Sequence, residues 1–265
     1  MSKIKKAFEK SNAFIGFITA GDPTKEATVE YILEMEKAGA DLVEIGIPFS
    51  DPTAEGPVIQ EASLRALKGG MTTEGVFEIV EAVRKTSEIP LCLMTYLNPV
   101  YYYGYEAFFR RCEALGVDGI IIPDLPFEEK DEVEQVAKKY GVDLISLIAP
   151  TSQERIGRIA KEATGFIYIV SSMGVTGVRN EFVTDIKHMV EEVRKVTDAP
   201  CAVGFGISTP SHGKEFCEIA DGIIVGSAIV KMIGEYGTNA HEKIYEYVKQ
   251  MKDACTKNVC TKNTQ

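Results

Sequence analysis

Three carboxylates lie within or just after one short apolar segment, and their spacing suggests acid–base chemistry. Glu44 lies in the short apolar stretch that begins at Leu42, and Asp51 and Glu55 follow in a loop rich in Ser, Asp and Pro. A strand covered on both faces is apolar throughout, so a carboxylate near its end costs desolvation free energy unless it is paired, protonated or used. Two such acids can serve one pocket as general acid and general base. A structural glutamate bonded to loop amides explains these residues alone equally well.

Two glycine-containing turns near the C-terminus favour a phosphate site. Gly204-Phe205-Gly206 follows the apolar run 200–203, and Gly226-Ser227 follows the run 221–225 and opens a helix. Backbone N–H groups at such turns and the positive end of a helix dipole bind phosphate. Turn conformation explains either glycine alone, but their joint position after the last two runs favours phosphate.

Other polar or small residues have two interpretations each. The segment 171–179 is rich in small residues and is either a lid that excludes water or a plain surface loop, and its Gly177 is able to add an amide to the phosphate site. Asp124 and Asn98 are expected to cap a helix or hold a loop rather than to catalyse. Tyr168 is expected to line the core or the pocket, since its ordinary pKa lies near 10.

The pattern of apolar runs predicts the elements that position these residues. Eight short runs recur at 13–18, 41–45, 90–94, 118–122, 143–148, 165–170, 200–203 and 221–225. Helical spacing of apolar residues separates most of them, as at Val133, Val136, Ala137 and Tyr140, and again at Ile186, Met189, Val190 and Val193. A Gly-Ala-Asp or Gly-Val-Asp turn back to a strand starts at residues 39, 116 and 141.

Eight strand–helix units predict an α/β fold, a single (β/α)8 TIM barrel over residues 1–265 with extra N-terminal and loop helices. An open doubly wound sheet is the alternative, but no GxGxxG opens a helix after the first strand. The tail from about residue 253 is expected to be frayed. In a barrel the chemistry lies at the C-terminal strand ends. We predict these ends at Phe17 and Thr19, Glu44, Tyr96 and Asn98, Asp124, Tyr168, Gly204 and Phe205, and Gly226 and Ser227.

Composition and charge exclude several classes of protein. Hydrophobic residues make up 45% of the chain and charged residues 26%, and no apolar run is long enough to span a bilayer. No signal peptide is evident at the N-terminus, which favours a cytoplasmic enzyme. The net charge of -10 argues against nonspecific binding to nucleic acid or anionic membranes. The six cysteines lack metal-type spacing and are expected to be reduced and mostly buried.

Two kinds of side chain are missing from the predicted strand ends, and their absence disfavours two kinds of chemistry. No lysine lies at a predicted strand end, which disfavours a Schiff-base aldolase. His188, His212 and His241 fall in helical patterns, which disfavours a histidine metal site. The strand ends are mainly aromatic and aliphatic, which suits a flat apolar ligand. The sequence therefore predicts metal-free and cofactor-free acid–base chemistry on a phosphorylated substrate with a flat apolar end.

The motifs resemble the tryptophan synthase α subunit family over nearly the whole chain in order. The matching segments are 16–23 (GFITAGDP), 42–52 (LVEIGIPFSDP), 54–60 (AEGPVIQ), 96–99 (YLNP), 123–126 (PDLP), 174–177 (GVTG), 204–208 (GFGIS) and 226–231 (GSAIVK). The resemblance implies a barrel lyase that cleaves indole-3-glycerol phosphate to indole and glyceraldehyde 3-phosphate. It also implies an α2β2 complex with a β subunit that carries pyridoxal phosphate and receives the indole. A stand-alone lyase and a weakly catalytic binding subunit are the alternatives.

Roles for single residues follow from the same resemblance. It implies that Glu44 moves protons to the indole carbon and from the glycerol hydroxyl, and that Glu55 accepts the indole N–H. The family's usual residue at position 55 is Asp, and Thr53 stands where an aliphatic residue is usual. The implied substrate-binding residues are Phe17, Tyr96, Ile121, Tyr168, Thr176, Gly177, Gly204, Phe205, Gly206, Gly226 and Ser227. Asp51, Asn98, Asp124 and Pro126 are implied to support or face the β subunit.

Overall fold

Nine short strands form one parallel sheet. The computed structural model describes residues 3–150, 153–170, 179–204 and 206–256. The strands are β1 (Ala13–Thr19), β2 (Leu42–Gly46), β3 (Leu91–Met94), β4 (Gly119–Ile121), β5 (Asp143–Leu144), β6 (Ser146–Ile148), β7 (Ile167–Val170), β8 (Cys201–Gly204) and β9 (Gly222–Val225). Their spatial order is β5-β4-β3-β2-β1-β9-β8-β7-β6.

The sheet closes into a barrel because its two outermost strands are consecutive in the chain. Only Ile145 separates β5 from β6, and its N–H donates to the carbonyl of Ile120 on β4 at 2.9 Å. β5 pairs with β4 and β6 pairs with β7, so the predicted fifth strand, 143–148, is one interrupted strand that joins both neighbours. The prediction of an eight-stranded TIM barrel is confirmed.

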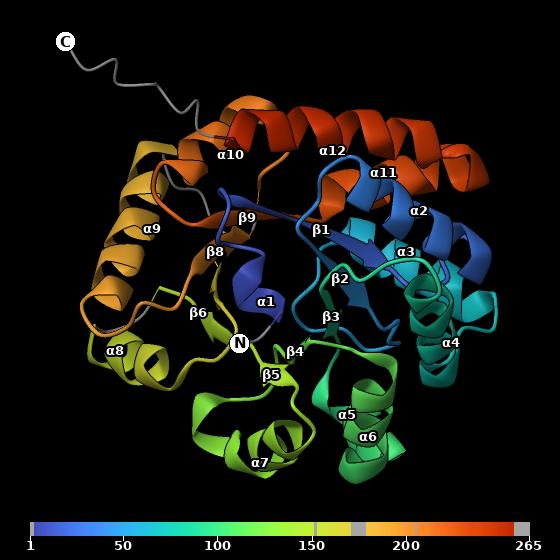
Figure 1. Cartoon of the computed structure of the whole chain (residues 1–265), viewed down its shortest axis with the longest axis horizontal. Helices are drawn as coiled ribbons and strands as arrows, with labels where there is room; N and C mark the ends of the chain where they lie inside the picture. Colours follow the sequence, from blue (N-terminus) through green and yellow to red (C-terminus); the bar gives the residue numbers. More distant parts are fainter. Residues whose placement is uncertain (1–2, 151–152, 171–178, 205, 257–265) are drawn as a thin grey trace.

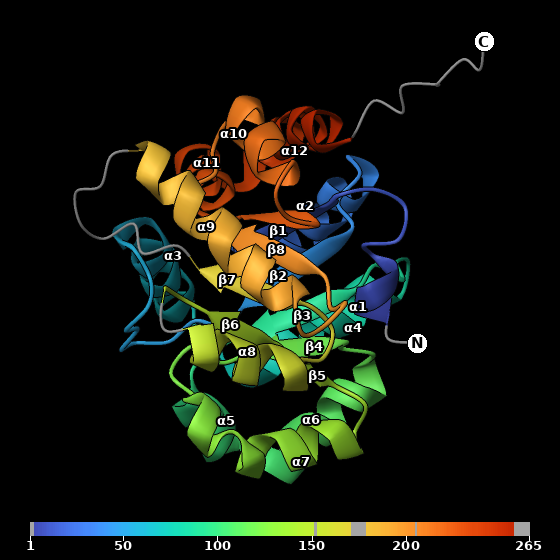
Figure 2. The ribbon, with the colours of Figure 1, turned by 90° about the vertical axis from the view of Figure 1, so that its left-hand side faces the viewer.

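Helices surround the strands (Figure 1). Their bounds are α1 (Lys3–Lys6), α2 (Lys25–Lys37), α3 (Pro57–Lys68), α4 (Thr73–Arg84), α5 (Leu97–Tyr103), α6 (Tyr105–Leu115), α7 (Asp131–Lys139), α8 (Gln153–Glu162), α9 (Arg179–Arg194), α10 (Pro210–Cys217), α11 (Ser227–Tyr236) and α12 (His241–Cys255), with short 3-10 turns η1 (Phe127–Glu129) and η2 (Gly237–Asn239). Helices α10, α11 and α12 lie on the side of the strands opposite to α5, α6 and α7 (Figure 2). The expected extra helices are present, since α1 precedes the first strand and helix pairs follow β2 and β3.

Local sequence signals explain where several helices begin. The hydroxyls of Thr24 and Thr72 accept hydrogen bonds from the amides of Ala27 and Gly75, both at 3.1 Å, which caps α2 and α4. Pro57 occupies the first position of α3, where its missing N–H costs nothing. The two helical spacings predicted around Val133 and Ile186 form α7 and α9.

Alternate side chains of the strands point into the barrel. Ile15, Leu42, Cys92 and Ile224 form a buried interior cluster, which Ile4 of α1 joins from the N-terminal side. Glu44 lies two residues beyond Leu42 on β2 and therefore points to the same interior, nearer the C-terminal end. The other face of each strand packs against the helices.

The Gly-x-Asp turns connect neighbouring strands at the N-terminal end of the barrel. Gly39 and Gly116 have φ of +104° and +69°, which glycine adopts readily. The carboxylates two residues later, of Asp41 and Asp118, accept from the amides of Phe14 at 2.7 Å and Leu91 at 3.0 Å, each on the preceding strand. These turns therefore hold the barrel together at the end opposite to the predicted chemistry.

Some predicted boundaries are wrong. Strand β3 ends at Met94 rather than at Tyr96 or Asn98, because Leu97 already begins α5. Strand β4 ends at Ile121 rather than at Asp124, and Pro123 has no N–H for a further ladder bond. Helix α12 continues to Cys255, whose side chain is buried, so residues 253–255 do not belong to a frayed tail.

Two further findings concern long apolar helices and cysteines in the described part of the chain. No helix in it is both long and apolar enough to cross a membrane. Its five cysteines are buried free thiols, namely Cys92, Cys112, Cys201, Cys217 and Cys255, and Cys260 lies outside the described residues.

Candidate active site

A cavity of about 430 Å³ opens at the C-terminal end of the barrel. It contains seven of the residues that the sequence assigned to the site. These are Phe17, Glu44, Glu55, Tyr168, Gly206, Gly226 and Ser227. Both candidate acids, the aromatic residues Phe17 and Tyr168 and the Gly226–Ser227 turn thus lie around one space, although they come from segments up to about 200 residues apart.

Glu44 is a buried acid with an unsatisfied oxygen. Its side chain is 1% exposed, and Oε1 has no hydrogen-bond partner within the described residues. Burial disfavours the charged carboxylate and raises the pKa of Glu44 from 4.5 to about 8. At neutral pH the group is therefore mainly protonated and able to donate a proton into the cavity.

Glu55 lies on the loop before α3 and is held by Tyr96. The Tyr96 hydroxyl accepts from the amides of Thr53 at 3.1 Å and Ala54 at 3.0 Å, and it also hydrogen-bonds the Glu55 side chain. Partial burial raises the pKa of Glu55, and the bond from Tyr96 opposes that rise. Tyr96 is not among the described residues that line the cavity, so it acts here as a support for the loop.

A bidentate ion pair fixes the helix that follows Glu55. Arg65 of α3 donates from Nε and Nη2 to the two carboxylate oxygens of Asp22, both at 2.8 Å. Asp22 is 1% exposed and lies just after β1, so the pair joins α3 to the β1 end of the barrel. The position of the Glu55 loop relative to Glu44 thus depends on contacts at both of its ends.

The glycines have two different structural roles. Gly226 and Ser227 line the cavity at the N-terminus of α11, where backbone N–H groups have no partner within the helix. A Cβ atom on Gly204 would lie 2.2 Å from the Tyr168 hydroxyl oxygen, so this glycine is needed for packing. Gly204 is not among the described lining residues, and the phosphate contact assigned to it remains a prediction.

The remaining predicted residues lie elsewhere or outside the described part. Ile121 is buried in the interior cluster with Tyr168 and is not among the described residues that line the cavity. Asp51, Asn98, Asp124 and Pro126 are exposed, and the Asp124 carboxylate accepts from the amide of Leu97 at 2.9 Å, as expected of a residue that holds a loop. Thr176, Gly177 and Phe205 lie outside the described residues, as does most of the proposed lid, 171–178.

Sequence reasoning missed several residues that line the cavity. Val58 and Ile59 of α3 and Met94 of β3 add apolar surface. Lys231 of α11 adds a cation, which the sequence analysis named only as part of the segment 226–231. Helical spacing indicates its position, since Lys231 is four residues after Ser227 and shares a helix face with it.

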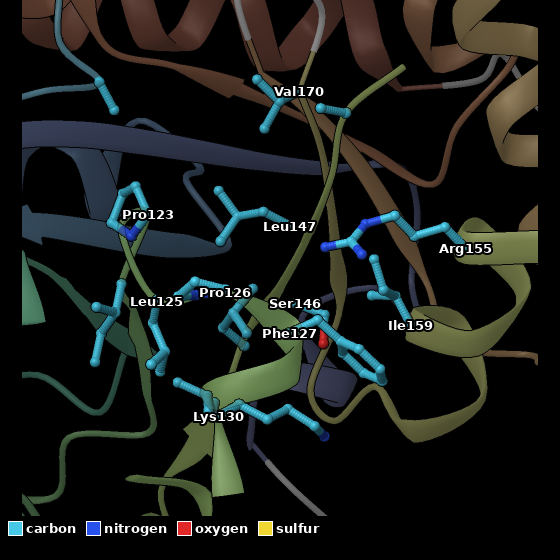
Figure 3. A pocket seen from close by; sticks show the side chains of 15 residues that line it. Pro123, Leu125, Pro126, Phe127, Lys130, Ser146, Leu147, Arg155, Ile159 and Val170 are labelled. Carbon is cyan, nitrogen blue, oxygen red and sulfur yellow. The ribbon is translucent and has the colours of Figure 1, made fainter. Parts of the chain in front are cut away.

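A second cavity of about 500 Å³ lies beside the first, and Ala54 lines both. Figure 3 shows its apolar wall, with Leu125, Pro126 and Leu147, and the Arg155 side chain that reaches it from α8. Its described lining contains no carboxylate side chain, whereas the first cavity contains two. We therefore take the first cavity as the candidate active site.

Metal ligands are not grouped in the described part of the chain. No cluster of three or more His, Cys, Asp or Glu side chains there is suited to hold a metal ion. His188 and His212 lie within α9 and α10, and His241 begins α12, as their sequence patterns predicted.

Known proteins resemble this chain along most of its length. The family model described as tryptophan synthase alpha chain matches residues 2–257. The tryptophan synthase alpha chain of Lacticaseibacillus casei is 50% identical over 254 residues, which cover 96% of both chains. That of Lactiplantibacillus plantarum is 48% identical over 255 residues, again 96% of both.

Solved structures agree with the sequence relatives. Tryptophan synthase subunit alpha from Legionella pneumophila superposes with a TM-score of 0.88 at 38% identity, covering 96% of this chain and 98% of that one. A chain of the tryptophan synthase a2b2 complex from Pyrococcus furiosus gives a TM-score of 0.85 at 39% identity, covering 92% and 99%. With the barrel, the paired acids and these matches in agreement, the chain belongs to the tryptophan synthase alpha chain family.

Proposed function

We propose that Glu44 and Glu55 are the acid–base pair with which this chain cleaves indole-3-glycerol phosphate. The cleavage is the α reaction of tryptophan synthase, which makes the chain a carbon–carbon lyase of L-tryptophan biosynthesis. The observation that carries the residue assignment is the buried carboxyl of Glu44. It faces the same cavity as Glu55, one of its oxygens has no partner within the described residues, and its pKa is raised to about 8.

Protons move in a closed cycle in this mechanism. Protonated Glu44 donates its proton to C3 of the indole ring, and Glu55 accepts the proton of the ring nitrogen. The Glu44 carboxylate then takes the proton of the glycerol hydroxyl next to the ring. The bond between C3 and that carbon breaks, its electron pair returns to the ring, and the carbon becomes the aldehyde of glyceraldehyde 3-phosphate. Glu55 returns its proton to the nitrogen, which completes indole.

The two ends of the substrate suit two groups of residues that line the cavity. Phe17, Met94 and Tyr168 supply apolar surface for the flat indole ring. Gly226 and Ser227 supply amides at the N-terminus of α11 for the phosphate. Substrate held at both ends keeps its reacting carbon between the two acids.

The partner we propose is a tryptophan synthase β subunit in an α2β2 complex. A solved relative at 39% identity is described as part of such a complex, and the exposed Asp51, Asn98 and Pro126 lie in the segments that follow β2, β3 and β4 at the C-terminal end of the barrel. Pyridoxal phosphate belongs to that β subunit in this proposal, and the α chain needs no cofactor of its own. We assign the enzyme to the cytoplasm, as expected for amino-acid biosynthesis.

Indole release tests this function directly. The purified chain is given indole-3-glycerol phosphate, and indole is measured while a β subunit is titrated in. We expect a weak basal rate that rises and saturates. Fast release that the β subunit does not change would identify a stand-alone lyase. No release despite demonstrated complex formation would identify a binding subunit and overturn the proposal.

A further inference from the structure

We infer that Lys231 is a substrate-binding residue that attracts and holds the phosphate group. This inference rests on the proposed function, because it concerns the phosphorylated substrate of the same cavity. Lys231 is the one cation among the described residues that line the cavity, where it accompanies the acids Glu44 and Glu55.

The geometry of α11 places the Lys231 side chain over the phosphate turn. Ser227 is the first residue of α11 and Lys231 the fifth, so the two lie on one face of the helix, one turn apart. Side chains in a helix lean toward its N-terminus, and the long lysine chain therefore extends back toward Gly226 and Ser227. Both of these residues line the same cavity as Lys231.

No described side chain binds Lys231, so its ammonium group is available to a ligand. It is exposed, and neither an ion pair nor a hydrogen bond joins it to another described side chain. Many exposed lysines of this protein are paired instead, such as Lys25 with Glu78 at 2.6 Å and Lys139 with Glu106 at 2.8 Å. Among the described residues, no carboxylate forms an ion pair with the Lys231 ammonium group.

The charge of the whole molecule makes a local cation useful. The chain carries a net charge of -10, which repels an anionic substrate at long range. Helix amides bind phosphate through partial charges, and these cannot offset the roughly two negative charges of a phosphate monoester. A full positive charge one turn along the helix strengthens both attraction and binding without contacting the reacting carbon.

Calorimetric titration with inorganic phosphate and with glycerol 3-phosphate measures this role separately from cleavage. We expect Lys231→Gln to weaken the binding of both about three- to tenfold and to flatten its dependence on salt. Lys231→Arg keeps the charge and is expected to stay within about twofold of wild type. Lys68→Gln is the matched control, because Lys68 is an exposed lysine near the end of α3, and its loss changes the net charge equally.

Kinetics provide the second readout. Lys231→Gln should raise KM for indole-3-glycerol phosphate by a similar factor and change kcat less than about twofold, since the group is remote from proton transfer. Unchanged phosphate binding in Lys231→Gln, an equal loss in Lys68→Gln, or a wild-type chain that does not bind phosphate would overturn the inference. A binding loss confined to Lys231→Gln in a chain that never releases indole would support Lys231 and overturn the proposed reaction instead.

Discussion

At the scale of single residues, burial sets the chemistry of Glu44. A carboxyl that is 1% exposed and lacks a counter-charge in the described surroundings holds its proton well above the ordinary range. Glu55 is less buried than Glu44. Its burial raises its pKa, and the hydrogen bond with Tyr96 opposes that rise. Two acids in one cavity thus differ in environment, and the proposed division into proton donor and proton acceptor rests on this difference.

Replacement of Glu44 by Gln tests its role as a proton donor. The amide has nearly the same shape but cannot transfer a proton, so we expect indole release to fall at least about 100-fold. Phosphate binding and the far-ultraviolet circular dichroism spectrum should remain as in wild type. Glu61→Gln, on the exposed face of α3, is the control and should keep full activity. Retained cleavage in Glu44→Gln would exclude Glu44 as the donor.

The raised pKa of Glu44 also predicts how stability depends on pH. The folded protein binds this proton more tightly than the unfolded chain does, with a pKa of about 8 against an unfolded value of 4.5. Between these two values the unfolded state loses the proton first, so the free energy of unfolding falls as pH rises. From pH 4.5 to above pH 8, the free energy of unfolding of wild type should fall by at most about 5 kcal/mol relative to that of Glu44→Gln.

Urea unfolding of both proteins across that range measures the difference. The variant removes this one titration and leaves the other groups in place, so it serves as the reference at each pH. A difference that stays constant from pH 4 to pH 9 would show that Glu44 ionises normally in the folded protein.

At the scale of elements, a loop and a helix present Glu55 to the barrel. Tyr96, directly before α5, holds two amides of the loop and the Glu55 carboxyl with one hydroxyl group. The Asp22–Arg65 pair fixes α3 on the other side of Glu55. Since three separate elements meet at this loop, a small shift in any of them moves an acid relative to the substrate.

Tyr96→Phe removes these loop contacts and keeps the buried ring. We expect kcat to fall about tenfold, because Glu55 loses its support, while the free energy of unfolding falls by only about 1 kcal/mol. Steady-state kinetics and urea unfolding check the two effects. Tyr101→Phe is the matched control, since Tyr101 is 68% exposed on α5. An unchanged kcat in Tyr96→Phe would show that the loop holds Glu55 without the hydroxyl.

At the scale of the whole molecule, closure of the barrel brings the site together. The cavity combines residues of the first strand with residues that follow the eighth and ninth, and β1 pairs with β9. Closure on the far side depends on the interrupted strand β5–β6, where Ile145 bonds to Ile120. A defect there should therefore affect a site to which Ile145 does not belong.

Ile145→Pro tests how much this closure contributes to the stability of the barrel. Proline removes the N–H that bonds to the Ile120 carbonyl and leaves a buried acceptor unpaired, so we expect the free energy of unfolding to fall by about 3 kcal/mol or more. Ile145→Val keeps the bond and should cost only about 1 kcal/mol. Urea unfolding compares the two. Equal losses in both variants would show that side-chain packing, and not the ladder bond, matters at this position.

Local patterns in the sequence determined the barrel, most of its elements and the identity of the acids. Eight apolar runs with helical spacing between them suffice for the fold, because each strand–helix unit must bury its apolar face against its neighbours. Glu44 was evident because a charged residue inside a buried strand conflicts with the pattern around it. The limits of β3 and β4 were misjudged because large apolar side chains continue beyond both strands, at Tyr96 and Leu97 after β3 and at Ile122 after β4.

Only the tertiary structure decided which of these residues share a cavity and which contacts each one makes there. The packing role of Gly204 against Tyr168, the support of Glu55 by Tyr96 and the place of Lys231 in the cavity join residues 36 or more positions apart, or depend on the exact position of a helix. The value of about 8 for the pKa of Glu44 likewise depends on its burial, with no counter-charge beside it among the described residues. Desolvation and distance belong to three-dimensional surroundings, and no local pattern in the chain contains them.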